Sequence, residues 1–110
     1  HQREQAEKFG VEIYQMKDLA KLSSLSFSKP VYCSIDIDAL DPAYAPGVSH
    51  FEPGGLSTRQ LIDCINGFRG RLIGADIVEY NPERDFHNLT AMVAAKLLKE
   101  VIARIYHDNS

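Results

Sequence analysis

Two apolar runs with a helical segment between them set the pattern of this chain. Residues 31–35 read Val-Tyr-Cys-Ser-Ile, and residues 72–78 read Leu-Ile-Gly-Ala-Asp-Ile-Val. Both runs are short and rich in β-branched or aromatic side chains, and Pro30 prevents a helix from continuing into the first. Each run therefore predicts a buried strand.

The segment between the runs has the periodicity of an amphipathic helix. Ser57 is a candidate N-cap with Gln60 three residues later, which is the spacing of a capping box, and Gly70 is expected to end the helix. The apolar residues on one helical face are Leu61, Ile62, Cys64, Ile65 and Phe68. A strand, a helix and a strand with a crossover of this length predict a right-handed βαβ unit in a parallel sheet, and hence an α/β fold.

A last helix is expected to begin at Asn88 or Thr90 and to cover one face of the sheet. Its predicted apolar stripe consists of Met92, Ala95, Leu98, Val101, Ile102 and Ile105. Near the start of the chain, the pattern predicts a helix at residues 1–8 that Gly10 stops, a strand at 11–15 and a short helix at 16–22.

Carboxylates follow both predicted strands. Asp36 and Asp38 stand two residues apart, so on an extended backbone both side chains point to the same face. Glu79 follows the second strand, and parallel strands place it at the same edge of the sheet. Two anions aimed into one space need a cation, of which a hard divalent metal is the simplest. The structural alternatives are an aspartate that caps the next turn and a salt bridge from Glu79 to Arg84.

A long loop at residues 41–55 separates the first strand from the helix. It holds three prolines and three glycines, and loops of this length in compact domains tend to be functional. Asp41 is predicted to fix the turn before Pro42. His50 is a candidate metal ligand or substrate contact, with a plain surface histidine as the default interpretation.

Composition argues against several classes of protein. The 110 residues are 45% hydrophobic and 25% charged with a formal net charge of −3, which is typical of one globular domain or part of one. No basic cluster suggests nucleic-acid binding, and no apolar run approaches the roughly 20 residues of a membrane span. Cys33 and Cys64 read as small buried hydrophobes of a reduced intracellular protein.

These motifs resemble those of the ureohydrolase family, which comprises arginases, agmatinases and their relatives. The second metal-binding signature of that family looks like residues 34–38 (Ser-Ile-Asp-Ile-Asp), Asp41-Pro42, residues 45–47 (Ala-Pro-Gly) and residues 52–56 (Glu-Pro-Gly-Gly-Leu). The family's next segments are similar to residues 74–82 (Gly-Ala-Asp-Ile-Val-Glu-Tyr-Asn-Pro) and to the start of the last helix, residues 90–96. Residues 3–12 and the loop at 47–52 resemble the plant-type arginase branch.

The resemblance implies a fold and a set of residue roles. The fold would be the C-terminal part of a three-layer α/β/α arrangement with a mainly parallel sheet. Two manganese ions would lie at its carboxyl-terminal rim, with Asp36 bridging both and Asp38 chelating one. Glu79 would grip the guanidinium group of the substrate, and His50 would lie in the loop that lines the substrate pocket. The implied reaction converts arginine to urea and ornithine, with agmatine or another guanidino compound as the alternative substrate.

The sequence also departs from the family pattern. A Gly-Gly-Asp-His type segment and an Asp-Ala-His-x-Asp segment, which supply the other metal ligands, do not occur in it. Because two carboxylates cannot hold two divalent ions at their usual coordination numbers, residues 1–110 are expected to be a C-terminal fragment of one ureohydrolase domain that is inactive and poorly stable alone. The whole protein is expected in the cytoplasm or mitochondria, as a trimer or hexamer.

Two other interpretations stay open. One is a non-catalytic, truncated product that binds the rest of a homologous oligomer. The other is a single-ion Mg²⁺ or Ca²⁺ site that Asp36, Asp38 and Glu79 form in an unrelated α/β fold.

Overall fold

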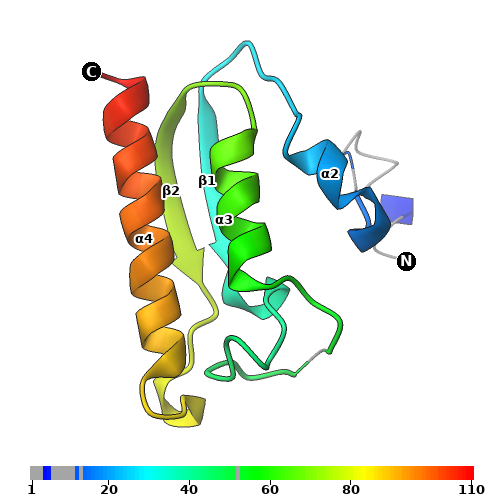
Figure 1. Ribbon diagram of the computed structural model, residues 1–110, viewed down its shortest axis with the longest axis vertical. Helices are drawn as coiled ribbons and strands as arrows, with labels where there is room; N and C mark the ends of the chain where they lie inside the picture. The colour runs from blue at the N-terminus through cyan, green and yellow to red at the C-terminus, as the bar shows by residue number, and fades with distance from the viewer. Residues whose placement is uncertain (1–3, 6–11, 13, 52) are drawn as a thin grey trace.

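The computed structural model describes residues 4–5, 12, 14–51 and 53–110 (Figure 1). Its elements are η1 (Met16–Asp18), α2 (Leu19–Leu22), β1 (Val31–Asp36), η2 (Ile37–Ala39), α3 (Thr58–Gly67), β2 (Leu72–Val78), η3 (Pro82–Arg84) and α4 (Leu89–Asp108), where η marks a 3-10 helix. The short helix expected at 16–22 is present as η1 and α2. Most of the helix expected at 1–8, its stop at Gly10, and residues 11 and 13 of the expected strand lie outside the described residues. Residues 12, 14 and 15 have no strand structure.

The two apolar runs form a pair of parallel strands. β1 and β2 are hydrogen-bonded neighbours, and their register places Ile35 beside Ile77 and Asp36 beside Val78. Since α3 connects them (Figure 1), the predicted strand, helix and strand unit is confirmed. Both strands end at the same edge of the sheet, so Asp36 and Glu79 are brought to that edge together.

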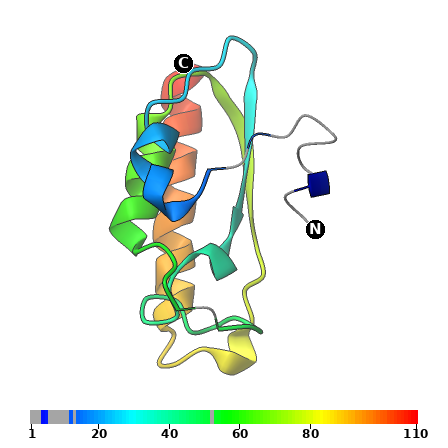
Figure 2. The same cartoon turned by 90° about the vertical axis from the view of Figure 1, so that its right-hand side faces the viewer.

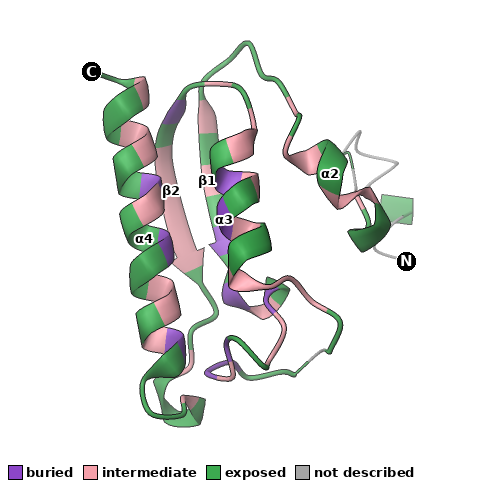
Figure 3. Ribbon diagram, viewed as in Figure 1, coloured by how far each residue is buried: buried purple, intermediate pink, exposed green. Residues whose placement is uncertain are grey.

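The helices lie on one side of the sheet. Figure 2 shows α2, α3 and α4 on the same side of the two strands. The core on this side, whose buried residues Figure 3 marks in purple, includes Ile35, Ile62, Ile65, Leu72, Leu97 and Val101. On the opposite side Tyr32 is 60% exposed, so β1 alternates in burial and is not buried throughout as predicted. The α/β class is confirmed. From residue 14 onward, the described chain supplies the sheet and one helical layer of the expected three-layer arrangement, because none of its helices covers the other face of the sheet.

α3 begins as its sequence predicts and ends earlier. Ser57 and Gln60 form the capping box, in which the Gln60 N–H donates to Ser57 Oγ at 3.1 Å and the Ser57 N–H donates to Gln60 Oε1 at 2.9 Å. The helix ends at Gly67 and not at Gly70. A Cβ on Gly67 would lie 2.7 Å from the carbonyl oxygen of Ser23, so the segment after α2 approaches the helix closely at this point.

The buried face of α4 is not the predicted stripe. Val101 and Ile105 face the core as expected, whereas Met92 is 68% exposed and Leu98 and Ile102 are exposed too. The side chains that pack toward the core instead are Thr90, Val93, Ala94 and Leu97. None of the described helices, α4 included, combines the length and apolar character needed to cross a membrane.

A carboxylate upstream of α4 caps its first turn. Asn88 is the N-cap by position, but its backbone is left-handed and its side chain makes no cap hydrogen bond. Asp85 accepts from the N–H groups of Thr90 at 2.8 Å and Ala91 at 3.0 Å, and from the hydroxyl of Tyr80 at 2.9 Å. Although desolvation opposes ionisation, these donors lower the pKa of Asp85 to about 2.

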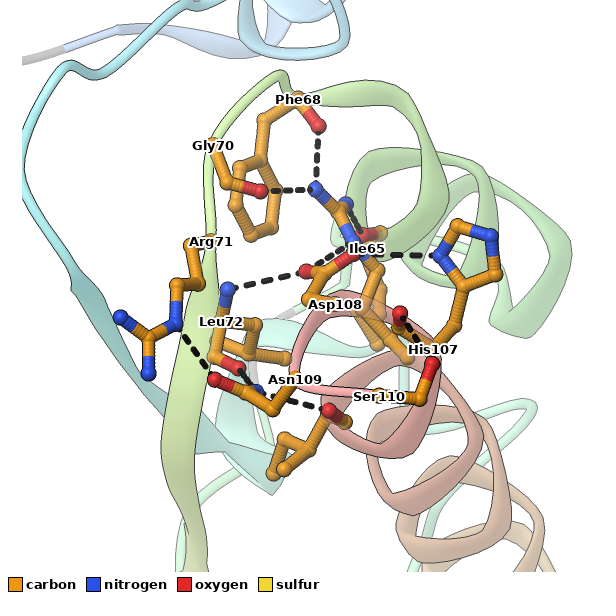
Figure 4. A network of polar contacts seen from close by, with 11 residues as sticks. Ile65, Phe68, Gly70, Arg71, Leu72, His107, Asp108, Asn109 and Ser110 are labelled. Atoms are coloured by element: carbon orange, nitrogen blue, oxygen red, sulfur yellow. Dashed lines mark hydrogen bonds and ion pairs between the residues drawn. The ribbon is translucent and has the colours of Figure 1, made fainter.

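The other end of α4 is tied to the turn between α3 and β2. The guanidinium of Arg104 donates to the carbonyl oxygens of Ile65 at 2.6 Å, Phe68 at 2.7 Å and Gly70 at 3.0 Å, and pairs with Asp108 at 3.1 Å. Figure 4 shows these carbonyls converging beside Asp108. Arg104 thereby satisfies carbonyls at the end of α3 that have no partner within the helix.

We expect Arg104→Ala to lower the free energy of unfolding by about 2–3 kcal/mol, because it leaves three carbonyls and the Asp108 carboxylate without their charged donor. Urea denaturation of variant and parent measures the change. Arg59→Ala is the matched control, since its pair with Asp63 is exposed and 4.0 Å long, and should cost about 0.5 kcal/mol or less. Equal effects of the two substitutions would contradict this role for Arg104.

The Asp85 cap should make stability depend on pH. Its folded-state pKa of about 2 lies below the value of about 3.9 in an unfolded chain. The stabilisation is therefore fully present above about pH 4 and is lost as the pH falls toward 2. Thermal unfolding of the parent and of Asp85→Asn should show midpoints that differ most at pH 6, approach each other from about pH 4 downward and converge only below about pH 2. A difference that stays constant over this range would refute the assignment.

Candidate active site at the carboxyl ends of the strands

Asp36 and Asp38 lie where β1 ends. The strand stops at Asp36, and Asp38 lies in η2, so the prediction of a shared face on one extended strand does not describe the backbone at Asp38. Asp36 is exposed, and its Oδ1 accepts the Asp38 N–H at 2.8 Å, which caps the 3-10 turn. Ile35 and Ile37 are both buried, and their burial holds the carboxylates at the sheet edge.

One carboxylate oxygen at this edge lacks a partner. Asp38 Oδ1 is buried, and it accepts no hydrogen bond from the described residues. A buried carboxylate oxygen without a donor is costly, and a cation satisfies it. No lysine or arginine of the described chain pairs with either Asp36 or Asp38. Hard oxygen ligands of this kind suit Mg²⁺, Ca²⁺ or Mn²⁺.

The described residues do not complete a metal cage. They contain no group of three or more histidine, cysteine, aspartate or glutamate side chains placed to hold one ion. Asp36 lines a hollow of about 410 Å³ beside α3, whereas Asp38 lines a second hollow of about 410 Å³ beside η1, and Ala39 lines both. The two aspartates thus offer only part of a coordination sphere. This agrees with the expectation from the sequence that two carboxylates are too few to hold two divalent ions.

Asp41 fixes the turn at Pro42, as the sequence predicts, and it also closes the loop after η2. Asp41 Oδ1 accepts the Ala43 N–H at 2.9 Å, and its Oδ2 accepts the Gly54 N–H at 2.9 Å. These donors lower the pKa of the Asp41 carboxyl below its ordinary value. The backbone of Asp41 also donates to the carbonyl of Leu56 at 2.8 Å, so one residue joins both ends of the loop.

Glu79 directly follows β2 in a conformation that is unusual for a residue with a side chain. Its φ angle is 69°, in the left-handed region that favours glycine. Glu79 is exposed, and among the described residues it has no ion pair. The alternative salt bridge to Arg84 is absent, because the Arg84 guanidinium lies elsewhere: it donates to the Ser49 carbonyl at 3.0 Å.

The part of the loop that carries His50 is attached to the segment after Glu79. The Asn81 N–H donates to the Gly47 carbonyl at 2.7 Å, and the Gly47 N–H donates to the buried Thr90 Oγ1 at 2.7 Å. A Cβ on Gly47 would lie 2.9 Å from Thr90, so only glycine permits this approach. His50 itself is exposed, and no residue of the described chain holds its ring by a hydrogen bond or ion pair.

Sequence reasoning missed a polar cluster on the uncovered face of the sheet. Tyr32 Oη donates to Asp76 Oδ2 at 2.9 Å, and Ser34 Oγ donates to Asp76 Oδ1 at 2.5 Å. The hydrogen bond to Asp76 raises the pKa of the Tyr32 hydroxyl. Ser34 and Asp76 are register partners that interrupt two otherwise apolar runs, and this was the signal that the sequence offered.

Cys33 and Cys64 are free thiols and are half-buried. Burial raises the pKa of the Cys33 thiol, which disfavours the reactive thiolate. Both residues line the hollow beside α3 with mostly apolar neighbours. This arrangement agrees with their interpretation as inert hydrophobic residues.

The site and its scaffold match known proteins over nearly the whole chain. The model of the Arginase family matches residues 1–103. Arginase 1, mitochondrial, from Oryza sativa subsp. indica is 51% identical over 111 residues, which are 94% of this chain and 33% of that protein. The chain thus spans about a third of the length of the curated relatives it matches.

Solved structures give the same result for the fold. The structure of arginase from Medicago truncatula has a TM-score of 0.85 and 46% identity, covering 94% of this chain and 35% of that one. A triple mutant of the T. brucei arginase-like protein bound with Mn²⁺ has a TM-score of 0.74 and 42% identity, covering 82% of this chain and 32% of that one. These likenesses include both strand ends and the loop between them, and the chain belongs to the arginase family.

Proposed function

We propose that the protein containing this chain is a manganese-dependent arginase, which hydrolyses the guanidinium group of arginine to urea and ornithine. The observation that carries the proposal is the buried, unpartnered Asp38 Oδ1 at the same sheet edge as Asp36 and Glu79. The relatives named arginase support the substrate, and the Mn²⁺-bound T. brucei structure supports the metal. Membership in the arginase family overturns the alternative of an unrelated α/β fold with a single Mg²⁺ or Ca²⁺ ion.

Two aspartates would take part in holding the metal. Asp36 would be a ligand shared by the two manganese ions of the holoenzyme and Asp38 a ligand of one, and the bound metal would supply hydroxide near neutral pH by lowering the pKa of water. Asp36 Oδ1 can keep its hydrogen bond from the Asp38 N–H at 2.8 Å while Oδ2 is available to bind a metal ion. The described residues do not complete a metal site, and the sequence lacks both histidine-containing segments that supply the other ligands in the family, so we expect the 110 residues to be inactive alone.

Glu79 would orient the substrate. A guanidinium presents a planar fork of donors, which a carboxylate binds by charge-assisted hydrogen bonds. Glu79 suits this role because it is exposed at the strand end and no arginine of the described chain competes for it. His50, in the neighbouring loop, is proposed as a second substrate contact, since the loop is attached to the segment after Glu79.

The setting of the protein is also part of the proposal. The rice relative and those from Arabidopsis thaliana carry mitochondrial in their names, so we propose an intracellular enzyme of mitochondria, with the cytoplasm as the alternative. A homo-oligomer, a trimer or hexamer, is proposed for the full-length protein. The partner at the site is a small guanidino compound, and we propose no nucleic-acid or membrane partner.

Asp38→Asn in the full-length protein should remove manganese from at least one site, because the amide replaces a buried anion with a neutral ligand. Elemental analysis after dialysis measures metal per subunit, with the parent expected to hold two ions. Asp63→Asn is the matched control, since Asp63 is exposed on α3 and pairs there with Arg59. Full metal occupancy in Asp38→Asn would refute the assignment of Asp38.

Glu79→Gln should leave metal content unchanged, raise KM for arginine at least about tenfold and lower kcat. The substitution removes the negative charge of Glu79 that would orient the substrate guanidinium. Urea release over a range of arginine concentrations gives both constants. Glu83→Gln, four residues later and also exposed, should behave as the parent does. Equal kinetics of Glu79→Gln and the parent would exclude Glu79 from substrate binding. If the parent prefers agmatine to arginine, the proposed activity is that of an agmatinase and not of an arginase.

A further inference from the structure

Arg84 contacts the residues on both sides of His50. Its Nη1 donates to the carbonyl oxygen of Ser49 at 3.0 Å, and its Cζ lies 4.5 Å from the centre of the Phe51 ring. The planar guanidinium stacks and donates at once, which a lysine cannot do. Arg84 therefore holds the backbone before His50 and the ring after it.

The rest of the loop gives this short segment little support. Ser49, His50 and Phe51 are all exposed, and Phe51 is 51% exposed in spite of its size. Val48, by contrast, is buried in the core. Among the described residues, Asn81 also holds this segment, through a 3.2 Å hydrogen bond from its Nδ2 to Ser49 Oγ. Polar and cation–π contacts to the segment after β2, and not apolar burial, thus hold residues 49–51.

The same contacts direct the Arg84 guanidinium away from Glu79. The two residues are five positions apart, which is close enough in sequence to suggest a salt bridge, yet Arg84 is bound to the loop and no ion pair joins them. A guanidinium resting on Glu79 would occupy the place of the guanidinium of a substrate. Binding Arg84 to Ser49 and Phe51 keeps that carboxylate available.

We propose that Arg84 is a positioning residue for substrate binding, which fixes the His50 loop against the segment that follows Glu79 and keeps its own guanidinium from Glu79. This inference rests on the proposed function, because it assigns a role at the same site. If the loop adopts the bound arrangement only a fraction of the time, apparent affinity falls by that fraction while the reaction of bound substrate is unchanged. The effect should therefore appear in KM.

The test compares full-length parent, Arg84→Ala and Arg84→Lys with arginine as substrate. We expect KM to rise about tenfold in both variants with kcat changed less than about twofold and manganese content unchanged. Amide hydrogen exchange of peptides covering residues 48–51 should become faster in both. Arg69→Ala is the matched control, since Arg69 is an exposed arginine next to the other end of β2 and should leave KM and exchange at the parent's values.

A double variant sharpens the assignment. Phe51→Ala should raise KM as Arg84→Ala does. In the double variant the increase in KM should be smaller than the product of the two single increases, because both substitutions remove the same contact. The positioning role would be overturned if Arg84→Ala kept the KM of the parent, or if it lost both its manganese and its activity. If the parent hydrolyses no guanidino substrate, the proposed function fails, and unchanged exchange at 48–51 in Arg84→Ala would then overturn the loop attachment separately.

Discussion

Parallel pairing of β1 with β2 is the constraint on which the site depends. The register sets Asp36 beside Val78, so Glu79 stands next to the end of β1 although more than forty residues separate them in the chain. Parallel strands need a crossover, and α3 with its capping box provides it. Ile35 is buried and Ile77 is partly buried on the helical side, which leaves the acidic side chains at the edge. A reversed second strand would carry Glu79 to the opposite end of the sheet.

Destabilising features lie at this edge of the sheet, and stabilising hydrogen bonds lie at both ends of α4. Asp38 has a buried oxygen without a donor, and Glu79 adopts a left-handed backbone; both cost free energy and are typical of functional sites. Just beyond them, Asp85 accepts four hydrogen bonds, including two from the first turn of α4. At the far end Arg104 ties α4 to the turn before β2. Rigid anchors at both ends of α4 can offset the cost at the site.

Local sequence signals predicted most elements correctly. They failed where a side chain has two or more possible neighbours and only the tertiary packing selects one. Ser57 with Gln60 and Asp41 before Pro42 act within a few residues, so their roles were readable. α4 is apolar on two faces, and packing against β2 buries Leu97 while leaving Met92 exposed, which periodicity alone could not decide. The same holds for Arg84: its sequence neighbours suggested Glu79, whereas the fold brings Ser49 and Phe51 within its reach.

The sequence by itself determined the α/β class, the strand that carries Asp36, the position of Glu79 after the second strand and the resemblance to the family, because each depends on short-range pattern or motif. Only the tertiary structure decided that Asp38 leaves the strand with a buried, unpartnered oxygen, that α3 stops at Gly67 against Ser23, and that the His50 loop is attached through Arg84. These features depend on contacts between segments distant in the chain, whose geometry no local pattern encodes.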